Sequence, residues 1–172
     1  MSTATAVPAG NTTPPAAPHV HITRFLRAPR ERVFAAWTEP EQMKNWMGPV
    51  NSTCTEAEAD LRVGGRYRIV VRSTPSPAGS TPPPADGEVQ QERTFTMFGE
   101  FLELRPPELV RYAWRGDRFP GQESVLTLRL HEENGGTRLE LLHEKFASAE
   151  SASGYHDGWN SVLDKFAAYL DR

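Results

Sequence analysis

The chain has 172 residues, a length that suits one domain with a core large enough to fold without disulfides or a metal. Charged residues make up 24% and the formal net charge is -3, so the chain lacks the positive field that attracts nucleic acid or an anionic membrane surface. The single cysteine, Cys54, cannot form an internal disulfide, which excludes a disulfide-rich secreted scaffold and leaves the cytoplasm as the expected location.

The first 18 residues are rich in alanine, threonine and proline and contain no charged residue. Such a segment buries too little apolar surface to offset the entropy of ordering, so we expect residues 1–18 to form a disordered tail. The segment has neither the basic start nor the apolar centre of a signal peptide. No later stretch approaches the ~20 consecutive apolar residues of a membrane span. We therefore expect one domain over residues 19–172.

The domain is predicted to begin with a strand and two short helices. Val20, Ile22 and Leu26 alternate with more polar positions, which indicates a strand. Pro29 suits the first turn of a helix that carries Trp37 on its apolar side.

The second short helix is predicted to start at a capping box. Thr38 and Glu41 have the spacing in which the two side chains cap each other's backbone N–H groups. The helix then carries Trp46, and Gly48 with Pro49 ends it.

Six further strands and a long helix are expected in the rest of the chain. The strands are predicted over residues 51–60, 66–73, 95–104, 109–116, 123–130 and 137–146. A proline-rich segment, residues 73–93, reads as a flexible insertion between two of them. The last helix starts near Ser148 and has Trp159, Val162 and Phe166 on one stripe. The pattern predicts an α+β domain in which a curved antiparallel sheet wraps around its C-terminal helix.

Three segments resemble the signatures of a known family, in the family's order: residues 28–49, 98–114 and 158–170. The chain resembles the heat-shock-protein ATPase activator homologue-like branch of the START-like, or SRPBCC, superfamily. The resemblance spans residues 20–171 and implies a helix-grip fold, shared with birch-pollen-allergen-like proteins and polyketide cyclases. It also implies a hydrophobic cavity between the sheet and the C-terminal helix.

Aromatic side chains could line such a cavity, because they offer apolar walls with a few polar tips that orient a ligand. The alternative is that most of them fill the core and contribute to stability alone. The candidate ligand-binding residues are Trp37, Trp46, Tyr67, Phe98, Tyr112, Trp114, His143, Trp159 and Leu163.

Two glycines, Gly154 and Gly158, lie four residues apart in the C-terminal helix and therefore on one face of it. Each costs the helix roughly 1 kcal/mol relative to alanine, so the pair needs a reason. Two explanations stay open. The glycines either allow close packing, or they leave space beside Trp159 for a ligand.

Counting residues by twos along the strands gives a candidate catalytic set. If the apolar members of each strand face inward, His143, Tyr112 and Glu100 face inward with them. A histidine with a carboxylate or a phenol can act as acid and base. The alternative is that His143 bonds locally and that Glu100 reaches solvent.

Three functions follow as alternatives. The first is binding of a small hydrophobic molecule in the cavity, without a defined reaction. The second is a cyclase-like or hydrolase-like enzyme that uses His143 with Glu100 or Tyr112. The third, implied by the resemblance, is a co-chaperone-like module that binds a heat-shock ATPase. The sequence predicts no metal site and no cofactor, and nucleic acid is not an expected partner. A homodimer is a further open alternative.

Overall fold

The computed structural model describes residues 17–74 and 92–172, so most of the predicted tail and most of the predicted insertion lie outside the described residues. The described residues form one antiparallel sheet with the strand order β1-β7-β6-β5-β4-β3-β2. The strands are β1 (Val20–Leu26), β2 (Ser52–Ala59), β3 (Arg66–Ser73), β4 (Arg93–Arg105), β5 (Leu109–Gly116), β6 (Ser124–Glu133) and β7 (Gly136–Glu144). The helices are α1 (Arg30–Thr38), α2 (Pro40–Met43) and α3 (Ala149–Leu170).

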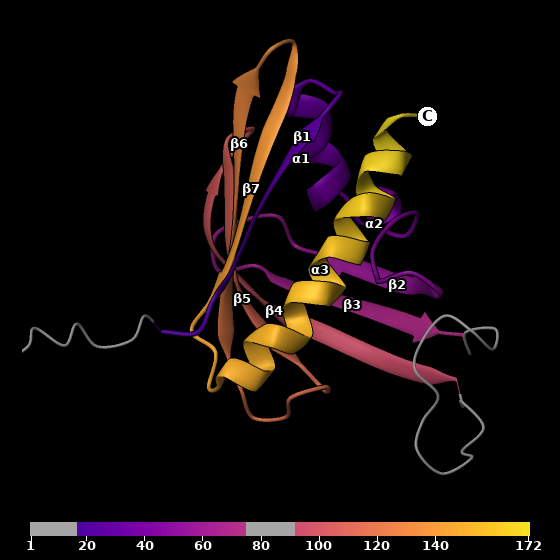
Figure 1. Cartoon of the computed structure of the whole chain (residues 1–172), viewed down its shortest axis with the longest axis vertical. Helices are drawn as coiled ribbons and strands as arrows, with labels where there is room; N and C mark the ends of the chain where they lie inside the picture. The colour runs from indigo at the N-terminus through magenta and orange to yellow at the C-terminus, as the bar shows by residue number, and fades with distance from the viewer. Residues whose placement is uncertain (1–16, 75–91) are drawn as a thin grey trace, which may run out of the picture.

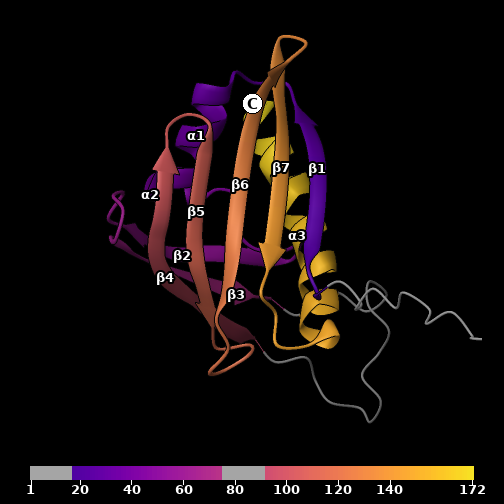
Figure 2. The ribbon, with the colours of Figure 1, turned by 90° about the vertical axis from the view of Figure 1, so that its left-hand side faces the viewer.

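The sheet curves around α3, and the helix crosses its inner face (Figure 1). Turned by 90°, the same molecule shows β4, β5, β6, β7 and β1 side by side with α3 behind them (Figure 2). This is the helix-grip arrangement that the sequence predicts. The order of elements, with two short helices after the first strand and a long helix at the end, is also confirmed.

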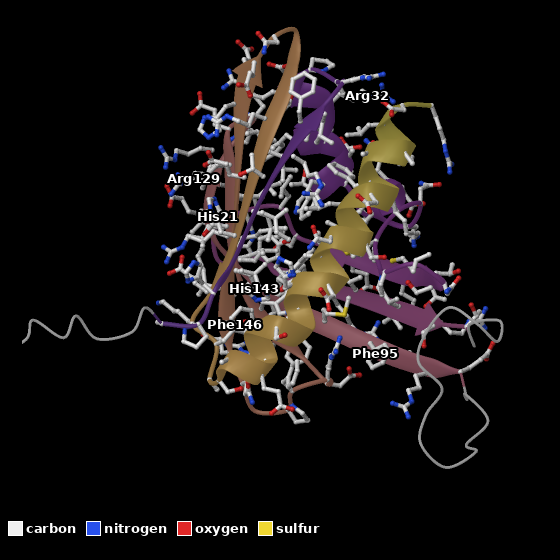
Figure 3. The ribbon with its side chains drawn as sticks, viewed as in Figure 1. His21, Arg32, Phe95, Arg129, His143 and Phe146 are labelled. Carbon is white, nitrogen blue, oxygen red and sulfur yellow. The ribbon has the colours of Figure 1, made fainter. Side chains whose placement is uncertain are left out.

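Alternation of side chains explains why the inner face of the sheet is apolar. Leu139 and Leu141 of β7 are fully buried on the inner face. Arg129 of β6 lies on the outer face (Figure 3). The β6–β7 hairpin closes through Asn134 and Gly135, which both have positive φ values of 47° and 76°. Asn-Gly accommodates this backbone because asparagine and glycine tolerate the left-handed region better than other residues do.

The predicted capping box at Thr38 is wrong. Thr38 is the last residue of α1, and its hydroxyl donates a 2.8 Å hydrogen bond to the carbonyl oxygen of Phe34 in the preceding turn. The next helix begins instead at Pro40, with Glu39 as a cap residue that makes no side-chain capping bond. An N-cap residue has extended rather than helical backbone, and Glu39, with φ -83° and ψ 121°, has this conformation, whereas Thr38 still belongs to α1.

The predicted inward direction of Phe98 and Glu100 is also wrong. The alternate residues Met97, Gly99 and Phe101 face the core, while Phe98 is 43% exposed. A β-bulge between residues 101 and 103 then shifts the register of β4 against β5. The bulge changes which residues face inward in the last part of the strand.

The start of α3 is fixed by a local cap. The Ser148 hydroxyl oxygen accepts a hydrogen bond from the Ser151 backbone N–H at 3.2 Å, as expected for a serine N-cap.

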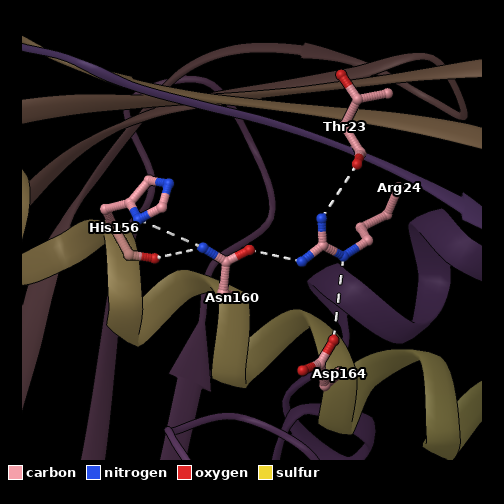
Figure 4. A network of polar contacts seen from close by, with 5 residues as sticks. All are labelled: Thr23, Arg24, His156, Asn160 and Asp164. Carbon is pink, nitrogen blue, oxygen red and sulfur yellow. Dashed lines mark hydrogen bonds and ion pairs between the residues drawn. The ribbon is translucent and has the colours of Figure 1, made fainter.

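A polar network holds the middle of α3 against β1 (Figure 4). One guanidinium nitrogen of Arg24 donates to Asn160 Oδ1 at 2.5 Å, and Arg24 Nε lies 4.0 Å from an Asp164 carboxylate oxygen. One side of the helix is thereby attached to β1 at the edge of the sheet. The opposite side faces β3, β4 and β5.

Candidate ligand-binding site

Eight of the nine predicted ligand-binding residues lie in the core. Two of the tryptophans among them, Trp37 and Trp46, pack tightly toward the C-terminal end of α3. The Trp37 and Trp46 ring centroids are 4.8 Å apart, and Trp46 lies 4.4 Å from Phe166 of α3. This end of the space between sheet and helix is therefore filled by the protein itself.

The polar tips of these aromatic residues have partners inside the protein. Trp37 Nε1 donates to the Tyr112 hydroxyl at 3.1 Å, and Trp46 Nε1 donates to the Ala36 carbonyl at 3.0 Å. The Tyr67 hydroxyl donates to the carbonyl oxygen of Ala113 at 2.7 Å. A buried polar group that already has a hydrogen-bond partner in the protein does not need a ligand to satisfy it.

His143 sits in a hydrogen-bonded chain in the core. Its Nδ1 accepts from Trp159 Nε1 at 3.0 Å, so the proton of the neutral ring is on Nε2, which lies 2.7 Å from the Ser124 hydroxyl. That hydroxyl in turn donates to the Trp114 carbonyl at 3.3 Å. Burial lowers the pKa of His143 from 6.5 to about 3. The ring is therefore neutral at physiological pH, and both of its nitrogens are occupied.

The structure does not bring the candidate catalytic residues together. Glu100 lies on the outer face, with its side chain 46% exposed and an oxygen 3.9 Å from Arg115. Tyr112 is buried on the inner face beside Trp37, and burial raises its pKa. Glu100 is thus separated by the sheet from Tyr112 and His143, and the predicted carboxylate–histidine pair does not form.

A pocket of about 120 Å³ opens beside the N-terminal half of α3, on the side away from β1. For comparison, an engineered apolar cavity of about 150 Å³ holds one benzene molecule. The helix contributes Gly154, Tyr155, Gly158, Trp159 and Val162. The sheet contributes Val71, Phe95, Thr96, Met97, Trp114 and Gly116. The adjoining loops contribute Met47, Gly48, Pro49, Asp117 and Arg118.

The glycines of α3 line this pocket. A Cβ atom placed on Gly158 would meet no atom within 4 Å, so this glycine is not explained by close packing. A Cβ atom on Gly154 would lie 3.3 Å from a guanidinium nitrogen of Arg118. The sequence left two explanations open, close packing or space for a ligand. Gly158 fits the second, because it leaves space beside Trp159. Gly154 fits the first, because a neighbouring side chain lies close to it.

Only two of the predicted ligand-binding residues, Trp114 and Trp159, line the pocket. Phe98 lines a separate depression on the outer face, together with Glu100 and the side chains of Arg66, Arg68 and Arg115. The other predicted residues belong to the core, which fills the rest of the space between the sheet and α3.

Sequence reasoning missed Phe95, Met97 and Tyr155. Phe95 and Met97 could have been found, because they alternate with Phe98 and lie on the opposite face of β4. Tyr155 could also have been found, because it directly follows Gly154, one of the two glycines that indicated a pocket on this part of the helix. Its hydroxyl accepts a 3.2 Å hydrogen bond from Trp114 Nε1, and burial raises its pKa.

The described residues hold no group of three or more histidine, cysteine, aspartate or glutamate side chains with metal-binding geometry. Within the same residues, no helix is long and apolar enough to cross a membrane.

Residues 27–171 match the family model described as "Activator of Hsp90 ATPase homolog 1-like protein". The chain belongs to this family. The sequence resemblance to the ATPase activator homologue-like branch is thereby confirmed. A comparison with curated proteins found no match.

Solved structures agree with the family assignment. Protein CV1439 from Chromobacterium violaceum is 27% identical, with a TM-score of 0.73 over 90% of this chain and 98% of that one. CalU16 from Micromonospora echinospora is 25% identical, with a TM-score of 0.62 over 88% of this chain and 75% of that one. The AHSA1 protein from Silicibacter pomeroyi is 23% identical and shares the fold, with a TM-score of 0.70 over 89% of this chain and 97% of that one.

Proposed function

We propose that the protein binds a small hydrophobic molecule, of the size of one aromatic ring or a short alkyl chain, in the pocket beside Gly158. The wall residues support an apolar ligand: Met97 and Val162 offer aliphatic surface, and Trp114 and Trp159 offer ring faces. The volume of about 120 Å³ supports a small ligand over a long lipid.

The observation that carries this proposal is the empty space at Gly158. A glycine inside a helix is unfavourable by about 1 kcal/mol relative to alanine. Where the glycine allows another backbone to approach, that contact offsets the cost. At Gly158 nothing lies within reach of a Cβ atom, while the position faces the pocket. If Gly158 keeps the pocket open, this explains both why no atom packs against it and why it faces the pocket.

The experiment is a titration with phenylpropanol, followed by the fluorescence of the two pocket tryptophans and by the melting temperature. At a ligand concentration of 100 times Kd, binding to the folded state adds about 2.7 kcal/mol of stability. For a domain of this size that corresponds to a rise of roughly 5–10 °C. Hexanol and other single-ring aromatic alcohols serve as further probes.

Two variants at one position make the test specific. Gly158→Leu projects a side chain into the pocket and should abolish binding, whereas Gly158→Ala adds one methyl group and should retain most of it. Absence of binding by all probes to the unmodified protein would contradict the proposal. The third alternative, a surface that binds a heat-shock ATPase, would then be the one to pursue.

We also propose that residues 19–172 act as one domain in the cytoplasm. Removal of residues 1–18 is expected to leave the affinity for phenylpropanol unchanged, because no described pocket residue comes from that segment.

A further inference from the structure

We propose that the pocket selects ligands that carry a carboxylate, held by Arg118 and by the hydroxyl of Tyr155 at its mouth. This inference rests on the proposed binding of a hydrophobic molecule and adds the chemistry of the ligand's polar end.

Arg118 supplies a positive charge that the rest of the described structure does not use. It lies in the turn after β5, is exposed, and lines the pocket. Its guanidinium lies over the ring of Phe119, with Cζ 5.6 Å from the ring centroid. Within residues 17–74 and 92–172 it forms no hydrogen bond and no ion pair. By contrast, Arg115 in the same region of the chain is paired with Glu123.

Tyr155 supplies a hydrogen-bond donor at the same end of the pocket. Its hydroxyl oxygen already accepts from Trp114 Nε1, which leaves the hydroxyl hydrogen without an acceptor among the described residues. The ring is held in place by Phe146, with centroids 5.4 Å apart, and by His143 at 4.8 Å. The donor therefore has a fixed position.

The two groups line the same pocket, and the guanidinium of Arg118 is close enough to act on the Tyr155 hydroxyl: burial raises the pKa of Tyr155, and the positive charge of Arg118 opposes that rise. A Cβ atom on Gly116 would lie 3.7 Å from the Tyr155 hydroxyl, and one on Gly154 would lie 3.3 Å from an Arg118 nitrogen. Glycine at both positions leaves room beside the polar groups. Asp117 also lines the mouth, and its Oδ2 accepts the Thr96 backbone N–H at 2.9 Å. Among the described residues no ion pair joins that carboxylate to Arg118, so the guanidinium remains available to an anion from outside.

A carboxylate matches this pair of donors, because one oxygen can accept the phenol hydrogen while the other faces the guanidinium. Charge-assisted hydrogen bonds of this kind are roughly twice as strong as neutral ones. The apolar body of the same molecule would lie on Trp114, Trp159 and Met97 deeper in the pocket.

The test compares phenylpropanoate with phenylpropanol, which share the ring and chain and differ in the polar end. The unmodified protein should bind the acid about tenfold more tightly, a ratio that corresponds to about 1.4 kcal/mol. Arg118→Gln should weaken binding of the acid more than binding of the alcohol, so that the ratio of the two affinities falls to about one. Added salt should weaken the preference in the same way, because the guanidinium is exposed.

Two further variants control the experiment. Arg129→Gln removes the same charge from the outer face of β6 and should change neither affinity. Tyr155→Phe should weaken acid binding, and its melting temperature is measured alongside because the Trp114 N–H loses its acceptor.

The outcomes separate the inference from the function on which it rests. If the alcohol binds but the acid binds no better, or if Arg118→Gln and Arg129→Gln behave alike, the carboxylate preference is overturned and the hydrophobic pocket stands. If neither compound binds, both proposals fail.

Discussion

Trp159 of α3 donates a hydrogen bond from its indole nitrogen to Nδ1 of His143 in β7, across 3.0 Å inside the core. The bond joins the long helix to β7, the second strand from one edge of the sheet. It also fixes the proton of the neutral imidazole on Nε2, facing Ser124. A histidine held in this way contributes to the stability of the grip between helix and sheet, and it is not set up as an acid or a base.

Trp159→Phe should therefore destabilise the protein strongly. It leaves Nδ1 of His143 buried without a donor, which costs about 1–3 kcal/mol, and it removes part of a packed ring. Tyr169→Phe is the matched control, because it removes one hydrogen bond, to Gln42, from a partly exposed position on the same helix. Urea unfolding should show a loss at Trp159 at least twice that at Tyr169. Equal losses would contradict the role given to this bond.

The burial of His143 predicts a pH dependence of stability. The unfolded chain protonates this residue below about pH 6.5, whereas the folded protein resists protonation until about pH 3. The free energy of unfolding should thus fall as the pH decreases through this window, with a slope of about 1.4 kcal/mol per pH unit from this one group. Urea unfolding at several pH values measures the slope.

Replacing His143 separates its contribution to the pH dependence of stability from the contribution of the aspartate and glutamate side chains. His143→Gln should flatten the dependence between about pH 6 and pH 4, even though the variant is less stable at neutral pH. His21→Gln, at an exposed position on β1 (Figure 3), should leave the slope as it is. A slope unchanged by His143→Gln would show that the residue is protonated in the folded state.

Two glycines should respond in opposite directions to alanine. A Cβ atom on Gly99 of β4 would lie 2.0 Å from the Ala113 carbonyl oxygen, so Gly99→Ala forces β4 away from β5. Overpacking of this kind costs about 1–3 kcal/mol or more. Gly158→Ala meets open space within a helix and should stabilise by up to about 1 kcal/mol. Thermal unfolding of the two variants, without ligand, decides the matter. Destabilisation by Gly158→Ala would mean that this glycine serves the fold.

The sequence was a good guide to elements whose apolar residues fall on one face. Leu139, Leu141 and His143 of β7 point inward as predicted, because the other face of the strand is mostly charged, with Arg138, Glu140 and Glu144 beside a single leucine, Leu142. In β4 the rule that the apolar face of a strand points inward gave the wrong face. Phe95 and Met97 alternate with Phe98, so both faces carry apolar residues and the pattern alone could not choose between them.

The site was harder to predict than the fold. The sequence identified the aromatic residues correctly as buried, with the exception of Phe98. It could not show that Trp37 and Trp46 close one end of the space while Trp159 borders an open one, because their partners lie far away along the chain. The paired glycines were the most informative local signal. Their cost to the helix had no local explanation, and the structure places both at the pocket.

The tryptophan indole N–H signals give the most direct test of a pocket beside Gly158. The chain has four tryptophans, and only Trp114 and Trp159 line the pocket, whereas Trp46 is fully buried against Phe166. A nitrogen–proton correlation spectrum recorded during titration with phenylpropanol should shift the Trp114 and Trp159 signals in a saturable way and leave Trp46 unchanged. Saturable shifts confined to Trp46, or no saturable shift of any indole signal, would contradict the account.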